Sequence, residues 1–207
     1  MHKYFLPYDV FERHKKVGSF IKRDQSVLDV GGELDHLSKF CSAKRLVVAN
    51  LQSGDIIIKK DKLPFKKNSF DVVCAIDVIE HIPHPKRAPF VKKLINNASK
   101  KVILSFPIGT PRHLAHEREI RKSLANKGID IGYLNEHIKY GLPTEFDIKS
   151  FTQDYRSQIF YAGNHIETAD YIQLGFFTGK KQQNPDRQWG FLCALSVLSA
   201  TGIQNAT

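Results

Sequence analysis

The sequence has little of what cross-links a protein or anchors it in a membrane. Its 207 residues include three cysteines, Cys41, Cys74 and Cys193, which are widely spaced and have apolar neighbours. An odd, scattered set of this kind favours reduced core residues in a cytoplasmic protein over disulfides or a zinc site. The longest apolar run, Trp189–Ala200, is shorter than the roughly 20 residues that cross a bilayer. Residues Met1–Asp9 contain no long apolar run, so we expect no signal peptide.

Signatures of sequence-specific nucleic-acid binding are also missing. We find no recognition helix, zinc finger or aromatic RNA-binding motif, so nucleic acid is not an expected partner. The formal net charge is nonetheless +10, and lysines and arginines occur in dispersed pairs along the chain. Such pairs are typical of a solvated surface, but a basic surface also attracts phosphate on a substrate or peripheral contact with an anionic membrane.

The stretch VLDVGGELDHLS at residues 27–38 contains the features around which an α/β domain is built. Residues 27–30 are expected to form a buried strand, Gly31 and Gly32 a turn, and Leu34 to about Cys41 a helix with one apolar face. In open α/β sheets, ligands bind over the carboxyl ends of the strands. The glycines let the backbone approach a ligand, and a helix N-terminus offers free N–H groups.

Hydrophobic periodicity predicts strands and helices in alternation along the whole chain. Strands are expected at residues 26–30, 45–49, 55–58, 70–76, 101–106, 157–162 and 190–198. Helices are expected at residues 8–22, 34–41, 89–98, 115–126, 143–155 and 167–177, and Thr144 is a plausible cap for the 143–155 helix. Strands that are separated by helices imply a parallel sheet with right-handed crossovers.

We expect one domain over residues 1–207, because hydrophobic residues at 42% and charged residues at 25% allow a sizeable core in a chain of this length. An N-terminal helical segment occupies residues 8–25. The pattern changes after Gly109, and we interpret residues 110–143 as an insertion that covers the ligand edge of the sheet as an acceptor lid.

Four motifs lie in the order and spacing of one enzyme family. They are VLDVGG (27–32), LPFKKNSFDVV (63–73), AIDVIEHIP (75–83) and KVILSFP (101–107). Together they resemble the class I S-adenosylmethionine-dependent methyltransferases, and within these the methyltransferase type 11-like group that includes ubiquinone and menaquinone biosynthesis enzymes. The resemblance covers roughly residues 10–107. It implies an α/β, Rossmann-like, seven-stranded, mostly parallel sheet with an antiparallel last strand, helices on both faces and a small insertion after the fifth strand.

The resemblance implies that S-adenosylmethionine binds over the carboxyl ends of these strands. Asp29 is suited to organise the amino-acid end of the cofactor. Asn50 ends the second strand, where the family usually has an acidic residue that binds both ribose hydroxyls. An amide can accept from one hydroxyl and donate to the other. The implied cofactor-binding residues are Asp29, Gly31, Gly32, Glu33, Asn50, Leu51, Asp61, Lys62, Leu63 and Asp77.

Three residues depart from the family pattern. Glu33 and Asp35 stand where the second and third glycines of the usual Gly-x-Gly-x-Gly loop would fall. The Glu33 side chain would either fill the space of the cofactor's amino-acid tail or attract its ammonium group. Lys59 lies near the position where relatives often have an aspartate that accepts from the adenine amine, and Asp61 would substitute for that aspartate if the loop shifts.

Methyl transfer needs few catalytic side chains, because correct positioning of the two reactants accounts for most of the rate enhancement. A base is needed only when the acceptor must lose a proton, as a hydroxyl must. His81 is the best candidate for this base, and Asp77 faces the methyl-donor region in relatives. The alternatives are that His81 bonds a neighbouring carbonyl and that Asp77 caps the helix that begins there.

Asp77, Glu80 and His81 have i, i+3, i+4 spacing, which places them on one helical face. An acidic version of this spacing holds a divalent cation in some ubiquinone-pathway relatives. Pro83 shortens the helix here and aspartate reaches less far than glutamate, so we predict no metal.

The insertion is the expected acceptor-binding part, because it is dense in hydrogen-bonding side chains. These are Arg112, His113, His116, Glu117, Arg118, Glu136, His137 and Tyr140. They suit a sugar or a phosphorylated acceptor. The alternative is a pair of helices that ion pairs hold together.

The main prediction is a methyltransferase that transfers a methyl group to an oxygen of a small-molecule, glycan or lipid-linked acceptor. An alternative is a non-catalytic protein of the same fold, retained as a binding or partner subunit, because Glu33, Asp35 and Lys59 depart from the family pattern. A dinucleotide-binding oxidoreductase shares the first turn, but the sequence lacks its Gly-x-Gly-x-x-Gly run and has Asn50 instead of an acid after the second strand.

Overall fold

The computed structural model describes residues 6, 8–59, 62–162 and 193–199. Within these residues the helices are α1 (Tyr8–Ser19), α2 (His84–Asn97), α3 (Pro111–Ala125), α4 (Gly132–Tyr140) and α5 (Glu145–Thr152). The strands are β1 (Ser26–Val30), β2 (Arg45–Asn50), β3 (Ile56–Ile57), β4 (Phe70–Ile76), β5 (Ala98–Pro107), β6 (Arg156–Ala162) and β7 (Cys193–Ser199). Short 3-10 turns form at η1 (Leu37–Lys39) and η2 (Ile79–His81).

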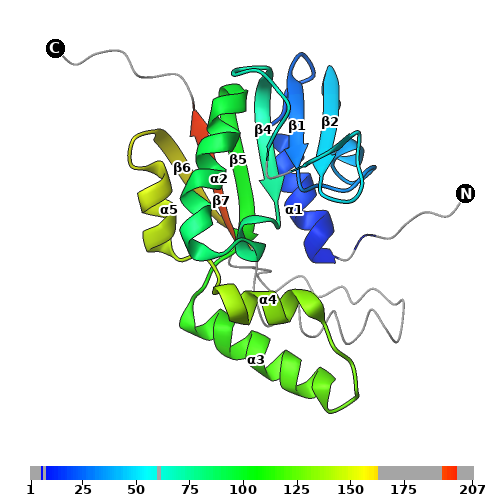
Figure 1. Cartoon of the computed structure of the whole chain (residues 1–207), viewed down its shortest axis with the longest axis vertical. Helices are drawn as coiled ribbons and strands as arrows, with labels where there is room; N and C mark the ends of the chain where they lie inside the picture. Colours follow the sequence, from blue (N-terminus) through cyan, green and yellow to red (C-terminus); the bar gives the residue numbers. More distant parts are fainter. Residues whose placement is uncertain (1–5, 7, 60–61, 163–192, 200–207) are drawn as a thin grey trace, which may run out of the picture.

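The strands form one sheet in the order β3-β2-β1-β4-β5-β7-β6 (Figure 1). The five strands from β3 to β5 run parallel, which confirms the predicted parallel α/β architecture. β7 pairs antiparallel with both β5 and β6. The order reverses between β1 and β4, so the carboxyl ends of these two strands border the crevice in which open α/β sheets bind ligands.

Two hydrophobic cores lie on opposite faces of the sheet, because alternate strand residues point to opposite sides. On one face, Leu28 and Val73 belong to the same cluster as Leu94 of α2 and Ile148 of α5. On the other face, Val27 clusters with residues of α1 and of η1. Figure 1 shows α1 and α2 on either side of the central strands. The central strands are thus buried on both faces, as the near-continuous apolar run of β4 predicts.

The predicted helix at residues 34–41 is wrong. Asp35 has φ +66° in the left-handed region, which interrupts a right-handed helix, and only the 3-10 turn η1 follows. Leu37 is buried at 1% exposure and Phe40 packs edge-to-face on Phe11 of α1, whereas Leu34 is 50% exposed, so the apolar residues of the segment do not form the expected helical face. No helix N-terminus therefore follows the glycine turn.

Other helix boundaries differ less from the predictions. The helix expected at residues 89–98 begins earlier, at His84, because a proline in the first turn lacks only an N–H group that has no partner inside the helix. The cap predicted at Thr144 is confirmed. Its side chain accepts a hydrogen bond from the Asp147 N–H, while the Asp147 carboxylate accepts from the Thr144 N–H.

The insertion forms α3 and α4, which lie beyond the carboxyl ends of the parallel strands (Figure 1). The predicted helix at 167–177, the first residues of the predicted last strand (190–192) and Asp61 lie outside the described residues. Cys41 and Cys74 are free thiols. None of the described helices is both long enough and apolar enough to span a bilayer.

Candidate active site at the carboxyl edge of the sheet

Asp29 is buried beneath the glycine turn near the end of β1. Its side chain is 0% exposed, and Oδ1 accepts a weak hydrogen bond from Cys74 Sγ at 3.6 Å. Oδ2 has no hydrogen-bond partner among the described residues. Burial raises the pKa of Asp29 to about 7, against the opposing effect of the Cys74 hydrogen bond. A buried carboxyl oxygen without a partner is a group that a ligand or an ordered water can satisfy.

Both residues of the turn over Asp29 must be glycine. Gly31 has φ +84°, and a Cβ on it would lie 2.4 Å from Cγ2 of Val78. A Cβ on Gly32 would lie only 2.1 Å from Oδ2 of Asp29. The turn therefore provides a cradle of bare main chain directly above the carboxyl group.

Asn50 fixes the conformation of this turn. Its side-chain amide donates to the carbonyl oxygens of Gly31 at 3.2 Å and of Gly32 at 2.8 Å. Its Oδ1 accepts from the N–H of Leu51, a residue whose side chain is 64% exposed. The pairing of the amide with the ribose hydroxyls stays a prediction; in this structure the amide N–H groups are engaged with the turn.

Glu33, the residue after the glycine turn, has a largely exposed side chain. Its carboxylate is 69% exposed, and Oε2 lies 3.4 Å from Nε2 of His36. The predicted filling of the cofactor space by this side chain is therefore wrong. Asp35 is also exposed. The two residues that replace family glycines extend into solvent and leave the main chain of the glycine turn open.

Asp77 follows β4 and is paired with an arginine from the first helix. Arg13 of α1 donates from Nε to Asp77 Oδ2 at 2.7 Å, and the two side chains are 15% and 25% exposed. Asp77 has φ +55° in the left-handed region. The 3-10 turn that follows has no side-chain cap, so the alternative that Asp77 caps a helix is wrong. No local sequence pattern predicts this pair, since its members are 64 positions apart.

The predicted adenine-contacting residues follow β3. Lys59 and Lys62 pair with each other through an isolated antiparallel bridge, and both side chains are exposed. Leu63 is partly buried and packs against the larger core. Leu63 therefore directs its side chain into the protein, next to the bridge between Lys59 and Lys62.

The turn η2 places Glu80 and His81 beside the ends of the strands. His81 Nδ1 lies 2.7 Å from Oε2 of Glu136, which belongs to α4 of the insertion. Burial lowers the pKa of His81 and the charge of His137 lowers it further, with Glu136 opposing, so His81 is neutral at neutral pH. Glu80 is 1% exposed, and burial followed by the charge of Asp77 raises its pKa well above the usual range.

Comparison with known proteins identifies the fold. Residues 28–94 match the family model described as a methyltransferase domain. That segment contains Asp29, the glycine turn, Asn50, Asp77, Glu80 and His81. The chain has the class I methyltransferase fold. No curated protein gives a significant sequence match.

Solved methyltransferases share this fold at low sequence identity. Magnesium protoporphyrin IX methyltransferase from Synechocystis PCC 6803, solved with S-adenosylhomocysteine, is 14% identical with a TM-score of 0.55, over 91% of this chain and 82% of that chain. A methyltransferase from Archaeoglobus fulgidus is 12% identical with a TM-score of 0.54, over 94% of each chain. Haemonchus contortus phosphoethanolamine N-methyltransferase 2, solved with phosphomonomethylethanolamine and S-adenosylhomocysteine, is 13% identical with a TM-score of 0.56, over 93% of this chain and 52% of that chain.

The insertion joins this methyltransferase fold through buried polar contacts. Oε1 of Glu117 in α3 lies 3.1 Å from His113 Nε2 and 2.8 Å from Nδ1 of His137 in α4. Burial alone would raise the pKa of Glu117, but the hydrogen bonds from the two imidazoles outweigh burial and lower it to about 2. The contact between α3 and α4 is thus made by buried Glu117–histidine hydrogen bonds, as the alternative of a paired set of helices predicts for these residues.

Arg87 of α2 is the functional-site residue that the sequence analysis missed most clearly. It is 1% exposed and donates from Nε to the carbonyls of Ile79 and Ile82 around η2. Its Nη2 donates to the carbonyls of Tyr140 and Gly141 at the end of α4. One guanidinium therefore connects the turn that contains His81 with the insertion. No sequence signal separates Arg87 from the many basic residues of the chain.

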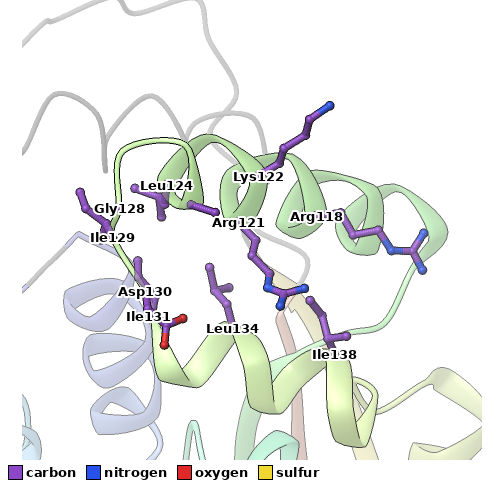
Figure 2. A pocket seen from close by; sticks show the side chains of 11 residues that line it. Arg118, Arg121, Lys122, Leu124, Gly128, Ile129, Asp130, Ile131, Leu134 and Ile138 are labelled. Carbon is purple, nitrogen blue, oxygen red and sulfur yellow. The ribbon is translucent and has the colours of Figure 1, made fainter.

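The insertion also encloses a pocket of about 440 Å³ between α3 and α4, apart from the strand ends (Figure 2). Its apolar wall includes Leu124, Ile129, Leu134 and Ile138, and its basic wall includes Arg118, Arg121 and Lys122. Figure 2 shows Leu134 and Arg121 pointing into the space between the two helices. Such a lining suits a ligand with an apolar body and an anionic group.

Proposed function

We propose that this protein is an S-adenosylmethionine-dependent methyltransferase. The observation that carries the proposal is the unsatisfied Asp29 Oδ2 beneath a turn that only glycine can form. A buried acceptor atom and a bare main chain, next to each other at the crevice of a methyltransferase fold, fit a cofactor that has an ammonium group and many hydrogen-bonding groups. The exposed position of Glu33 supports the proposal, because that side chain leaves the turn open.

The cofactor-binding residues have distinct roles in this proposal. Asp29 organises the amino-acid end through the backbone of the turn above it or through an ordered water, and Gly31 and Gly32 provide close main-chain contact. Asn50 acts through the shape of the glycine turn, which its amide holds in place. Leu51, Lys62 and Leu63 contact the nucleoside, Glu33 lies at the rim near the ammonium group, and Asp77 borders the methyl-donor region.

The bound cofactor supplies an electrophilic methyl group on a sulfonium. The protein positions the acceptor in line with that methyl group and receives a proton if the acceptor is a hydroxyl. His81 is the proposed base, because its neutral ring lies at the strand ends and its Nδ1 is held by Glu136. With the ring proton on Nδ1, the lone pair on Nε2 is available to the acceptor.

The proposed acceptor is a small-molecule, glycan or lipid-linked compound that is methylated on oxygen. The pocket of the insertion would hold its non-reacting part, with apolar groups against Leu134 and Ile138 and an anionic group near Arg118 and Arg121. The formal net charge of +10 supports an anionic acceptor or one that lies at an anionic membrane surface.

The test is methyl transfer from isotope-labelled S-adenosylmethionine to a panel of phosphorylated, glycan and lipid-linked alcohols. His81→Ala is expected to lower kcat by about 100-fold or more, with little change in S-adenosylhomocysteine affinity. The control is His84→Ala, which removes a histidine side chain that is 65% exposed. Unchanged turnover in His81→Ala would exclude His81 as the base.

A non-catalytic protein of the same fold is the second candidate. Two observations favour it: the Asn50 amide is engaged with the turn, and Asp77 is engaged with Arg13. Such a protein would bind S-adenosylhomocysteine weakly or not at all and would methylate no member of the panel. Calorimetry with S-adenosylhomocysteine separates the two candidates before any acceptor is known.

A further inference from the structure

Three potential metal ligands meet where the insertion touches the sheet edge. Glu80 and His81 come from η2, and His137 comes from α4. One ligand atom of each residue lies within 4.8 Å of the other two. The rings of His81 and His137 are 5.0 Å apart between centroids and are inclined by 37°. The spacing of Glu80 and His81 was noted in the sequence together with Asp77 and no metal was predicted, because nothing in the sequence places His137 of α4 beside η2.

Two atoms of the cluster are buried and lack a hydrogen-bond partner among the residues that the structure describes. Glu80 is 1% exposed and His137 is 6% exposed. Within the described part of the chain, Glu80 Oε2 and His137 Nε2 have no hydrogen-bond partner. Burying a carboxyl oxygen and an imidazole nitrogen side by side without hydrogen-bond partners lowers the stability of the fold unless a third group binds them.

The two imidazoles are oriented by carboxylates on their other nitrogens. Nδ1 of His137 lies 2.8 Å from Glu117 Oε1, and Nδ1 of His81 lies 2.7 Å from Glu136 Oε2. Metal-binding histidines characteristically donate their second N–H to a carboxylate, which fixes the tautomer and makes the ligand nitrogen more basic. In both rings this leaves Nε2 as the free lone pair.

We propose that Glu80, His81 and His137 bind one divalent transition-metal ion, for which Zn²⁺ is the probe. Two imidazoles and one carboxylate are a common donor set for such an ion when one position remains open to water or substrate. Asp77 is not a ligand, because its carboxylate is engaged with Arg13. The ligand set therefore spans the sheet edge and the insertion.

The geometry requires only a small contraction. Ligand atoms around one tetrahedral zinc ion are about 3.3 Å apart, since each lies roughly 2 Å from the metal. Atoms that lie within 4.8 Å of one another must approach by at most about 1.5 Å to reach that spacing. An ion at this place would fasten α4 to η2, beside the contacts that Arg87 already makes.

The role of the ion in catalysis rests on the proposed function, whereas ion binding itself does not. In the methyltransferase, the open position would hold an acceptor oxygen against the sheet edge. His81 cannot be both base and ligand, because its Nε2 has a single lone pair. Methyl transfer with and without a chelator therefore distinguishes the two roles.

The test is calorimetry of Zn²⁺ with the full chain after metal removal. We expect one ion per chain and at least a 10-fold loss of affinity in Glu80→Gln and in His137→Ala. Glu136→Gln is expected to weaken binding less, because it changes only the residue behind His81. His84→Ala is the matched control, since this exposed histidine lies outside the cluster, and its affinity should equal that of the wild type. Visible absorption of the Co²⁺-loaded protein should report tetrahedral coordination.

Glu80→Gln keeps the shape of the side chain, so it tests the ligand even if His137→Ala does not fold. Absence of Zn²⁺ binding, equal affinity in Glu80→Gln and wild type, or binding of Mg²⁺ in preference to Zn²⁺ would overturn the proposal. If Zn²⁺ binds as expected but S-adenosylhomocysteine does not bind, the proposed function fails and the metal site stands. If S-adenosylhomocysteine binds but Zn²⁺ does not, the metal site is rejected and the proposed function stands.

Discussion

At the scale of single residues, the contact between Gly32 and Asp29 is the tightest constraint on the site. A Cβ at position 32 would lie 2.1 Å from the carboxylate oxygen. Gly32→Ala should therefore displace Asp29 or the turn. We expect a loss of about 1–3 kcal/mol in the free energy of unfolding, which is typical of overpacking, together with weaker S-adenosylhomocysteine binding. Denaturant unfolding and calorimetry measure the two effects.

Gly132→Ala is the matched control for this substitution. A Cβ on Gly132 meets no atom within 4 Å, and the residue begins α4. The variant is expected to be neutral or to gain up to about 1 kcal/mol, because alanine reduces the freedom of the unfolded chain. Equal behaviour of the two alanine variants would contradict the packing of the turn over Asp29.

The buried Asp29 should give the protein a characteristic pH dependence of stability. Its folded-state pKa of about 7 lies above the ordinary value of 3.8, so the folded protein binds more protons than the unfolded chain between these values. Protonated Asp29 therefore contributes to the free energy of unfolding. This contribution is fully present below about pH 4 and is lost as the pH rises to about 7. A shift of about 3 units corresponds to at most roughly 4 kcal/mol.

Asp29→Asn tests this pH dependence, because an amide does not titrate. We expect the wild type to lose stability relative to the variant as the pH rises from about 4 to about 7, measured by denaturant unfolding at several pH values. A constant difference between the two proteins over this range would show that Asp29 is ionised when folded.

Predictions for single residues were most successful where the local main-chain conformation determines what the residue does. The glycine turn, the burial at the end of the first strand and the cap at Thr144 follow from local sequence. The pairings of Asn50 with the turn and of Asp77 with Arg13 do not, because hydrogen-bond partners that are distant in sequence leave no local pattern. The same reason explains why the sequence did not associate His137 with His81.

At the scale of elements, Arg87 joins α2, η2 and the end of α4. Arg87→Met keeps much of the apolar stem but removes every donor to the four carbonyls. Hydrogen bonds from a charged donor contribute about 1.5–3 kcal/mol each at most, and their loss leaves buried acceptors unsatisfied. We expect a destabilisation of about 2–4 kcal/mol and faster amide hydrogen exchange in α4.

Lys86→Met is the control for this variant, since Lys86 is the exposed neighbour of Arg87 on the same helix. It should change the free energy of unfolding by less than about 0.5 kcal/mol. Exchange in α4 that is equally slow in both variants would show that other contacts hold the insertion in place.

Strands were predicted more accurately than helices. The first and fourth strands have the predicted bounds, because strands buried on both faces are continuous apolar runs between polar residues. The helix expected after the glycine turn is absent, since apolar spacing at Leu34 and Leu37 does not reveal the left-handed backbone at Asp35. The prolines before residue 89 suggested that α2 begins there, but the helix begins at His84, because proline is well tolerated in a first helical turn.

At the scale of the whole molecule, the net charge of +10 should influence acceptor binding. Salt screens attraction between charges, and the screening length falls from about 30 Å at 0.01 M to about 10 Å at 0.1 M ionic strength. Raising the salt concentration over this range should raise KM for a phosphorylated acceptor several-fold and leave KM for a neutral analogue unchanged. Equal salt dependence for both acceptors would exclude the basic surface from acceptor recognition.

The arrangement of Asp29, the glycine turn and the strand ends in one crevice is the central claim, and binding of S-adenosylhomocysteine to the full chain tests it most directly. Isothermal titration calorimetry should give one site per chain with a dissociation constant in the micromolar range, weakened in Gly32→Ala and unchanged in Gly132→Ala. No measurable binding at millimolar ligand, or binding that Gly32→Ala does not affect, would contradict it.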